Sequence, residues 1–576
     1  MTLQILMTAI VILPVVNSLS ISQVSLSTTL GIVAGDRKQT EGNKIVNVFH
    51  SIPFAKPPVG DLRFRSPLPA EPWVGILDGT QRPKACWQSL DKTFGNFSGS
   101  EMWNPNTPRS EDCLYLNVWK PVGGEEVKTI LVWIYGGGFI SGTTTLDIYD
   151  GTQLAALSDV IVVSIAYRIG PLGFLYLNSD EAPGNAGLLD QALALKWVKD
   201  NALNLGGSPD SITIFGESAG AASVGFHLIS PVSKDLFNYA ILQSASELAD
   251  WAIHEPSLAK DISLKLAAAV LCSENNISAS INCLRSIQPQ VLCDLQGTLV
   301  TSVPFPFTPV IDHYFMPEHP REIIQKGGLK KTNILLGVNK NEGIYFNIYD
   351  FIEDYPLQGN GEITESQFDE IFPKYCDKTH LDCDQIKEGY IDSSNVSYKD
   401  LLDDITGDIY FKCPVVNLAK LFQQRGGRVF LYSFEHRLST NPWPEWTGVV
   451  HGYEIELVFG MPFSPTSVYT EEEKQLSLLM MELWTSFAKT GNPNFNSSNQ
   501  WPEYTEDSKE YVAIDATGLK VGHGLRESQC AILANATTSS QTPDFPAQTA
   551  PTTEAATSLT VDAGNLIRQV FQVFLQ

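Results

Sequence analysis

Ile212-Thr-Ile-Phe-Gly-Glu-Ser-Ala-Gly220 is the stretch that decides the fold, because an apolar, β-branched run leads straight into Gly-x-Ser-x-Gly. Helix-compatible residues follow as far as Leu228. A strand can turn this sharply into a helix only with small residues at Gly216 and Gly220, and the turn exposes the serine hydroxyl at the helix N-terminus. We therefore interpret Ser218 as a nucleophile on a strand-to-helix elbow. The alternative is a chance pentapeptide in an ordinary turn.

A serine hydroxyl is a weak nucleophile, so the chain must also supply a base, an acid that orients the base, and donors for an oxyanion. The N–H of Ala219 is one expected donor, and the glycine-rich loop in Trp133-Ile-Tyr-Gly-Gly-Gly-Phe139 can supply more, unless it is only a turn. For the base we consider His451, which interrupts a short apolar run, and for the acid Glu342, after the strand-like residues 334–338. The residues alone leave both choices open, because structural histidines and surface carboxylates are common.

Apolar runs typical of buried strands recur along the chain, at residues 129–135, 160–166, 212–215, 239–242, 333–337 and 429–434. Longer stretches with apolar residues at helical spacing lie between them, for example 186–201 and 471–489. Alternating buried strands and helices predict an α/β fold, with a mostly parallel sheet covered by helices on both faces.

The composition of the 576-residue chain is acidic, with 39 Lys and Arg against 64 Asp and Glu, a net charge of −25. Its 43% hydrophobic residues can form a large core, which excludes disorder or coiled coil as the main architecture. Nucleic acid is excluded as a partner because it requires a basic face. A cationic ligand would benefit from the charge, although plain solubility explains it equally well.

The two ends of the chain differ from the middle. An apolar stretch at residues 5–16, too short to span a bilayer, predicts a signal peptide over residues 1–20. We expect a catalytic domain at 21–534 and a Ser/Thr/Pro/Ala-rich tail at 535–576, with a short amphipathic end and no transmembrane segment. Secretion also agrees with five predicted glycosylation sites, Asn96, Asn276, Asn395, Asn496 and Asn535.

Nine cysteines suit disulfides in a secreted chain, and the odd number leaves at least one thiol over. No CxxC pair occurs, so the cysteines give little support to a metal site, and we expect no cofactor.

Several motifs together resemble the cholinesterase branch of the type-B carboxylesterases, over about residues 31–530. They are Ser110-Glu-Asp-Cys-Leu-Tyr-Leu-Asn-Val118, Gly136-Gly-Gly138, Phe215-Gly-Glu-Ser-Ala-Gly220, Asn341-Glu-Gly343 and Gly448-Val-Val-His-Gly-Tyr-Glu454. The resemblance implies an α/β-hydrolase fold and a secreted serine esterase that hydrolyses choline esters through an acyl-enzyme, as in neurotransmitter degradation. It implies Ser218, Glu342 and His451 as the catalytic residues, Gly137, Gly138 and Ala219 as the oxyanion hole, and Ser244 as support for the acid.

The resemblance also implies a site for a cationic ester. Trp103, in Phe97-Ser-Gly-Ser-Glu-Met-Trp103, matches the tryptophan that binds choline in this branch. Other matching positions are Asp91, Glu217, Tyr345, Phe346, Tyr349, Trp443, Tyr453 and Glu454. The alternative for any single aromatic residue is core packing.

Two departures from the family pattern concern acyl specificity and the rim of the site. Val303 stands where a first acyl-pocket phenylalanine is familiar, whereas Phe305 and Trp251 are kept, so propionyl and butyryl esters should fit beside acetyl esters. Ser89 and Ile140 replace rim tyrosines, so rim ligands should bind poorly.

The family pairing implies the disulfides Cys86–Cys113, Cys272–Cys283 and Cys413–Cys530, and the short separation of Cys376 and Cys383 suggests a fourth with Cys293 free. No cysteine follows Cys530, so we expect a monomer or weak oligomer without a tail-to-tail disulfide. Two alternatives to a choline esterase stay open: a general carboxylesterase of neutral esters, and a non-catalytic adhesion protein of the same fold.

Overall fold

The computed structural model describes residues 23–40, 42–273, 276–299, 303–379, 381–391, 397–495 and 500–536. The chain divides into two compact units, Met1–Ala536 and Thr537–Gln576, and all described residues lie in the first. The predicted signal peptide and all but the first two residues of the predicted tail therefore lie outside the described residues.

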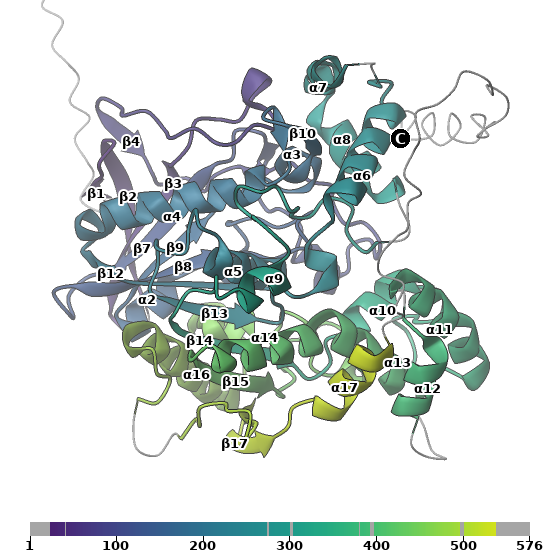
Figure 1. Ribbon diagram of the computed structural model, residues 1–576. Coiled ribbons are helices and arrows are strands. Elements are labelled where there is room, and N and C mark those ends of the chain that lie inside the picture. The colour runs from purple at the N-terminus through teal and green to yellow at the C-terminus, as the bar shows by residue number, and fades with distance from the viewer. Residues whose placement is uncertain are drawn as a thin grey trace, which may run out of the picture. The chain divides into compact units, whose positions relative to one another are not determined.

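A thirteen-stranded sheet forms the centre of the described part of the chain (Figure 1). Its strands lie in the order β1 (Gln23–Ser27), β2 (Ile32–Gln39), β3 (Ile45–Pro53), β7 (Tyr115–Pro121), β9 (Ile161–Ile165), β8 (Lys128–Ile134), β12 (Gly207–Glu217), β13 (Tyr239–Gln243), β14 (Asn333–Asn339), β15 (Arg428–Phe434), β16 (Glu510–Asp515) and β17 (Gly518–His523), with β4 (Ile76–Asp78) beside β2. All pairs from β9 to β16 are parallel, and the pairs along the rest of that order are antiparallel. The predicted mostly parallel sheet is confirmed. Each of the six predicted strand runs matches one of its strands, although the runs 129–135 and 160–166 extend one residue beyond β8 and one residue beyond each end of β9.

The helices in chain order are α1 (Ser98–Glu101), α2 (Thr152–Ser158), α3 (Gly170–Phe174), α4 (Ala186–Leu205), α5 (Ala219–Ile229), α6 (Pro256–Ala269), α7 (Ile277–Ser286), α8 (Pro289–Leu295), α9 (Pro320–Gln325), α10 (Ile344–Asp350), α11 (Glu365–Thr379), α12 (Cys383–Tyr390), α13 (Tyr398–Gly407), α14 (Cys413–Gln424), α15 (Ile455–Val458), α16 (Glu471–Thr490) and α17 (Glu527–Ala536). The helices predicted at 186–201 and 471–489 are α4 and α16. A capping box fixes the start of α16, where Thr470 and Glu473 bond to each other's backbone, and Gly491 ends it in a left-handed conformation.

The helices cover both faces of the sheet because the chain reverses its direction along it. From β8 the chain steps through α2 to β9, and then back through α4 to β12 on the other side of β8. Right-handed crossovers therefore put α2 and α4 on opposite faces. The connection through α5 steps along the sheet in the same direction as the one through α4, so α5 lies on the α4 face. Helix α16 packs against α2 on the other face. The central strands are thus buried on both sides; every residue of β8 is buried.

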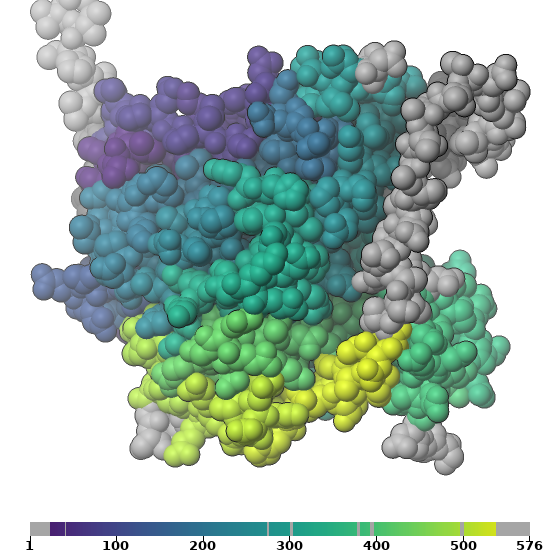
Figure 2. Space-filling view, viewed as in Figure 1, coloured from purple at the N-terminus to yellow at the C-terminus, as the bar shows by residue number. Residues whose placement is uncertain are grey.

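Helices α10 to α13 form a separate group beyond the carboxyl end of β14 (Figure 1). Helix α17 packs against α12, and the N–H of Asp382 donates to the carbonyl of Ala536 at 2.9 Å. Figure 2 shows α17 in yellow at the surface.

Four disulfides join the described cysteines: Cys86–Cys113, Cys272–Cys283, Cys376–Cys383 and Cys413–Cys530. The three pairs implied by the family resemblance and the fourth suggested by its short separation are confirmed. Cys293 is free and buried, also as predicted.

Candidate active site

The elbow at Ser218 joins β12 to α5, as the sequence predicts. Ser218 has a φ of 54° and a ψ of −124°, a backbone conformation that costs about 1–3 kcal/mol for a non-glycine residue and is concentrated at functional sites. Its neighbours must be glycine: a Cβ at Gly220 would lie 2.0 Å from the carbonyl oxygen of Ile134, and one at Gly216 would lie 2.6 Å from Gly220. The Ser218 N–H donates to the Gln243 carbonyl at 2.8 Å, which holds the elbow against β13.

The glycine-rich loop after β8 lies directly beside this elbow. A Cβ at Gly136 would approach the Cβ of Ser218 to 2.9 Å. Gly137 and Gly138 have φ values of 108° and 59°, and a Cβ on Gly138 would come within 2.4 Å of the Phe305 ring. Only glycine fits this loop. The two backbone amides predicted to bind an oxyanion are therefore carried by a segment that packs against Ser218.

His451 and Glu342 are brought together from loops 109 residues apart in the chain. The Nδ1 atom of His451 lies 2.5 Å from Oε2 of Glu342, and both side chains are buried. The other carboxylate oxygen of Glu342 accepts from the backbone N–H of Asn339 at 2.6 Å. Because a carboxylate at Nδ1 fixes the orientation of the ring, Nε2 of His451 is the atom left for proton transfer.

Glu217 faces that second nitrogen. Its Oε1 atom lies 3.1 Å from Nε2 of His451, and no hydrogen bond joins Nε2 to Ser218 or to any other described residue. Burial opposes the protonated form of His451, but the charges of Glu217 and Glu342 outweigh it and raise the pKa of the imidazole. For the Glu217 carboxyl, burial itself raises the pKa, because it disfavours the charged form. The site therefore retains a proton that must leave before His451 can act as a base.

The side chains of Trp103 and Glu217 lie beside the same residue of the histidine loop, Gly452. A Cβ at Gly452, the residue after His451, would lie 3.2 Å from the Trp103 ring and 3.3 Å from the Glu217 carboxylate. The Tyr453 ring meets Trp103 edge to face, with centroids 6.3 Å apart. An indole ring and a carboxylate thus lie together beside the histidine loop, a combination suited to an organic cation.

A second aromatic group lies between the acid loop and the segment that carries Trp103. Tyr345 and Tyr349 on α10 contact each other and Trp443, and the hydroxyl of Tyr349 donates to Asp91 at 2.6 Å. The predicted positions Asp91, Tyr345, Tyr349 and Trp443 are therefore one cluster, to which the structure adds Phe94 and Phe97. Ser89, at a predicted rim position, instead donates to Asp294 at 2.7 Å.

Two residues predicted to contact the acyl group, Trp251 and Phe305, lie beside the glycine loop. Trp251 meets Phe305 edge to face at 5.5 Å, and Phe305 packs against Gly138. Val303 is half-buried, without a ring to add to this wall. Phe411, which was not predicted as a site residue, contacts both Trp251 and His451, with ring centroids 5.9 and 4.4 Å apart. It lies in a π-helical turn, Asp408–Lys412, for which the sequence has no periodic signal.

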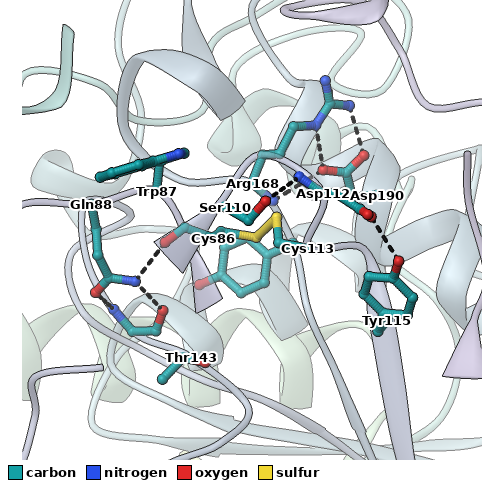
Figure 3. Close-up of a disulfide and its surroundings, with 12 residues drawn as sticks. Cys86, Trp87, Gln88, Ser110, Asp112, Cys113, Tyr115, Thr143, Arg168 and Asp190 are labelled. Atoms are coloured by element: carbon teal, nitrogen blue, oxygen red, sulfur yellow. Dashed lines mark hydrogen bonds and ion pairs between the residues drawn. A yellow bond between two sulfur atoms is a disulfide. The ribbon is translucent and has the colours of Figure 1, made fainter. Parts of the chain in front are cut away.

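The segment closed by Cys86–Cys113 carries both Asp91 and Trp103, and Figure 3 shows how its start is fixed. The side-chain amide of Gln88 donates to the carbonyl of Gly142 at 2.8 Å and accepts from its N–H at 2.9 Å. Gly142 follows the glycine-rich loop and packs against Gly136, so Gln88 ties the aromatic segment to the loop beside Ser218. Gln88 could not be predicted from the sequence, because one glutamine in a loop carries no pattern.

Two further expectations concern the acid and the surface. The hydroxyl of Ser244, expected to support Glu342, makes no hydrogen bond to another described residue, and the N–H of Asn339 bonds the acid instead. Asn96, Asn276 and Asn535 are exposed, whereas Asn395 and Asn496 lie outside the described residues. Within the described ranges, no helix is long and apolar enough to cross a membrane, and no group of His, Cys, Asp and Glu could hold a metal ion.

Comparison with known proteins gives a consistent result. The model of the carboxylesterase family matches residues 22–533. The chain is 41% identical to acetylcholinesterase of Leptinotarsa decemlineata, over 88% of this chain and 85% of that one. It is 42% identical to acetylcholinesterase of Electrophorus electricus over 88% of each chain, and 44% identical to cholinesterase of Mus musculus over 84% of this chain and 82% of that one. The chain therefore belongs to the carboxylesterase family and is a serine carboxylic-ester hydrolase.

Proposed function

We propose that this protein hydrolyses choline esters, acetylcholine foremost, through an acyl-enzyme on Ser218. The observation that carries the proposal is that Trp103 and Glu217 lie side by side at Gly452, where an added Cβ would touch both, next to the His451–Glu342 pair. A quaternary ammonium has no N–H to donate, so an aromatic face is its natural partner, and the attraction is worth up to about 2 kcal/mol when the site is dry.

In the proposed mechanism, Nε2 of His451 takes the proton of Ser218 as the oxygen attacks the ester carbonyl. The N–H groups of Gly137, Gly138 and Ala219 stabilise the oxyanion, and His451 returns the proton to the departing choline oxygen. Water, activated in the same way, then releases the acid from Ser218. Glu342 keeps the ring oriented and favours the imidazolium that forms in each step, which its 2.5 Å contact with Nδ1 supports.

Acyl selectivity follows from the wall that Trp251 and Phe305 form against the glycine loop. Since Val303 is smaller than the phenylalanine familiar at this position, we propose that propionyl and butyryl esters are also accepted. Each added methylene can contribute about 0.8 kcal/mol when it is buried.

We further propose that residues 1–20 are a signal peptide, that 21–534 form the catalytic domain, and that the protein is secreted as a glycosylated monomer or weak oligomer. Four disulfides and the exposed sequons at Asn96, Asn276 and Asn535 support this, because disulfides persist in oxidising compartments. Expression in cultured cells tests it. Activity in the medium with a mass that falls on N-glycosidase treatment is expected; activity confined to the cells contradicts it.

The substrate class is tested by comparing acetylthiocholine with its uncharged isostere, 3,3-dimethylbutyl thioacetate. We expect the native protein to prefer the cation in kcat/KM and Trp103→Ala to lose most of that preference, about thirtyfold for 2 kcal/mol. Trp87→Ala is the control, because Trp87 is on the same disulfide segment but its ring is covered by the Arg109 guanidinium. A preference that survives Trp103→Ala contradicts the choline site, and no preference in the native protein favours a general esterase of neutral esters.

A further inference from the structure

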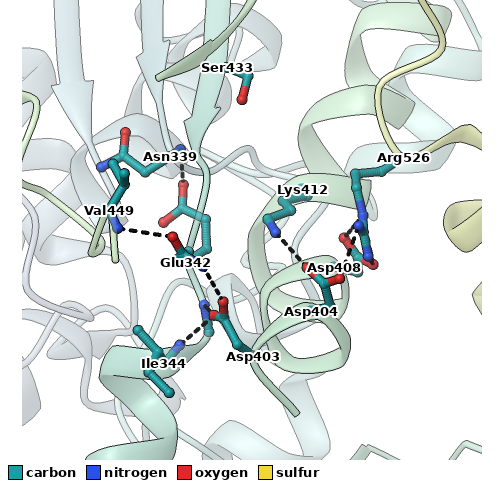
Figure 4. Close-up of polar contacts among 12 residues, drawn as sticks. Asn339, Glu342, Ile344, Asp403, Asp404, Asp408, Lys412, Ser433, Val449 and Arg526 are labelled. Atoms are coloured by element: carbon teal, nitrogen blue, oxygen red, sulfur yellow. Dashed lines mark hydrogen bonds and ion pairs between the residues drawn. The ribbon is translucent and has the colours of Figure 1, made fainter. Parts of the chain in front are cut away.

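Asp403 is a buried carboxylate that lies against the loop carrying Glu342. Its side chain is 3% exposed, on α13, and it accepts three hydrogen bonds. Two come from the backbone N–H groups of Gly343 and Ile344 at 2.8 and 2.7 Å, and these residues directly follow Glu342. The third comes from the side-chain amide of Asn341 at 2.8 Å, the residue directly before Glu342. Asp403 therefore binds the chain on both sides of the acid (Figure 4).

Asn341 carries the connection onward to the histidine loop. Its side-chain oxygen accepts from the N–H of Val449 at 2.9 Å, and its own N–H donates to the Val449 carbonyl at 3.0 Å. Val449 stands two residues before His451. A Cβ at Gly448 would lie 2.2 Å from the Asn341 oxygen, so this approach also requires glycine. One chain of hydrogen bonds thus joins Asp403, the Glu342 loop and the His451 loop.

We propose that Asp403 is a positioning residue for the reaction: it sets the relative placement of Glu342 and His451 through the Asn341 side chain. The inference rests on the proposed roles of these two residues. Glu342 follows β14, whereas His451 lies in the segment between β15 and α15, so the two loops are far apart along the chain. A misplacement of about 1 Å can cost about a hundredfold in rate, which makes such a link important for catalysis.

The surroundings of Asp403 keep it in the accepting form. Burial raises its pKa to about 6, against the effect of the Lys412 charge, so at neutral pH the carboxylate is ionised and can only accept. The adjacent Asp404 is bound differently: it pairs with Lys412 at 3.3 Å and with Arg526 at 3.2 Å, and it is half exposed (Figure 4). Asp404 makes no hydrogen bond or ion pair with the described residues of the acid loop and provides a matched control.

An exchange of donor and acceptor tests the proposal. In Asp403→Asn, an amide NH₂ replaces the oxygen that accepts from Asn341, so two donors face each other. In Asn341→Asp, two carboxylates face each other. In the double variant, the carboxylate now at position 341 can accept from both the amide at position 403 and the N–H of Val449. The remaining oxygen of that amide can still accept from Gly343 and Ile344, so the exchange restores every hydrogen bond and the net charge.

The assay uses 4-nitrophenyl acetate, a neutral ester, with active sites counted by stoichiometric organophosphate labelling. We expect kcat per labelled site to fall at least about tenfold in each single variant, with little change in KM, and to recover in the double variant. Asp404→Asn should keep the native kcat, which separates a link to the loops from a general effect of lost charge. Thermal unfolding of each variant is followed in parallel, because a merely structural role would change stability and leave kcat per site unchanged.

The inference is overturned if Asp403→Asn keeps the native kcat. It is also overturned if kcat of the double variant is no higher than the two single losses multiplied together would give. If Asp403→Asn does not fold, Asn341→Ala takes its place, since it cuts the link and keeps both backbone bonds of Asp403; native kcat there overturns it equally. Failure of the proposed function is a separate result: the native protein would then hydrolyse 4-nitrophenyl acetate but not prefer acetylthiocholine.

Discussion

Replacing Glu217 by glutamine should shift the pH dependence of the enzyme towards acid. The change removes a charge 3.1 Å from Nε2 of His451 and keeps the size of the side chain. Together with Glu342, that charge raises the pKa of the imidazole. A base must be deprotonated to act, so the acid limb of activity lies at the pKa of His451. Lowering this pKa moves the limb to lower pH.

The size of the shift can be bounded from the distance. Two charges 3.1 Å apart interact by about 5 kcal/mol at an effective dielectric constant of about 20, or about 4 pKa units. Part of this is missing at neutral pH, because burial raises the pKa of Glu217 itself and leaves it partly protonated. We therefore expect a shift of at least about one pH unit.

The assay is kcat/KM from pH 5 to 10, which reports the free enzyme. A neutral ester such as 4-nitrophenyl acetate is needed, because Glu217 also lies where a cationic substrate would bind. Glu456→Gln is the control: Glu456 is buried nearby on α15, and its carboxylate is bonded by Tyr469. An acid limb in Glu217→Gln at the native position, or at higher pH, would refute the assigned electrostatics of His451.

The acyl wall, the glycine loop and a buried core carboxylate can each be tested by one substitution. Val303→Phe should lower the butyryl-to-acetyl rate ratio with thiocholine esters, because a ring fills the space beside Phe305; an unchanged ratio contradicts the proposed acyl wall. Gly138→Ala should lower kcat about a hundredfold or more, since its Cβ would lie 2.4 Å from the Phe305 ring and disturb an oxyanion donor; near-native kcat would contradict that role. Burial raises the pKa of Glu247 to about 7, above its value in the unfolded chain, so ionisation of this carboxyl lowers the stability of the folded protein as the pH rises. The stability that Glu247→Gln gains over the native protein, measured by urea unfolding, should therefore grow by about 2–3 kcal/mol from pH 5 to pH 8. A difference that does not change with pH would contradict this prediction.

Much of the fold could be predicted because its signals are local. The strand before Ser218 and the two flanking glycines are contiguous in sequence, and the structure explains the glycines by contacts closer than any Cβ tolerates. The central strands read as apolar runs because both of their faces are covered. Elements of this kind can be inferred from short windows of residues.

The pairing of Glu342 with His451 depends on a contact between residues far apart in the chain, which no short stretch of sequence contains. Nothing local links Glu342 to His451. Their loop contexts made both residues candidates, and the family resemblance then selected them from the other carboxylates and histidines. Asp403 was missed because acidic residues on a helix indicate a solvated face, whereas this one points into the core. Phe411 was missed because the π-helical turn that presents it follows neither helical nor strand periodicity.

The central claim is that the ester is cleaved through a covalent intermediate on Ser218. Acetylthiocholine can be mixed with the enzyme, quenched in acid within milliseconds, and the digested protein analysed by mass spectrometry. The proposed mechanism predicts an acetyl group on Ser218 in the peptide that contains Gly216 and Gly220, and no turnover by Ser218→Ala. An acetyl group on another residue, or native turnover by Ser218→Ala, would contradict it.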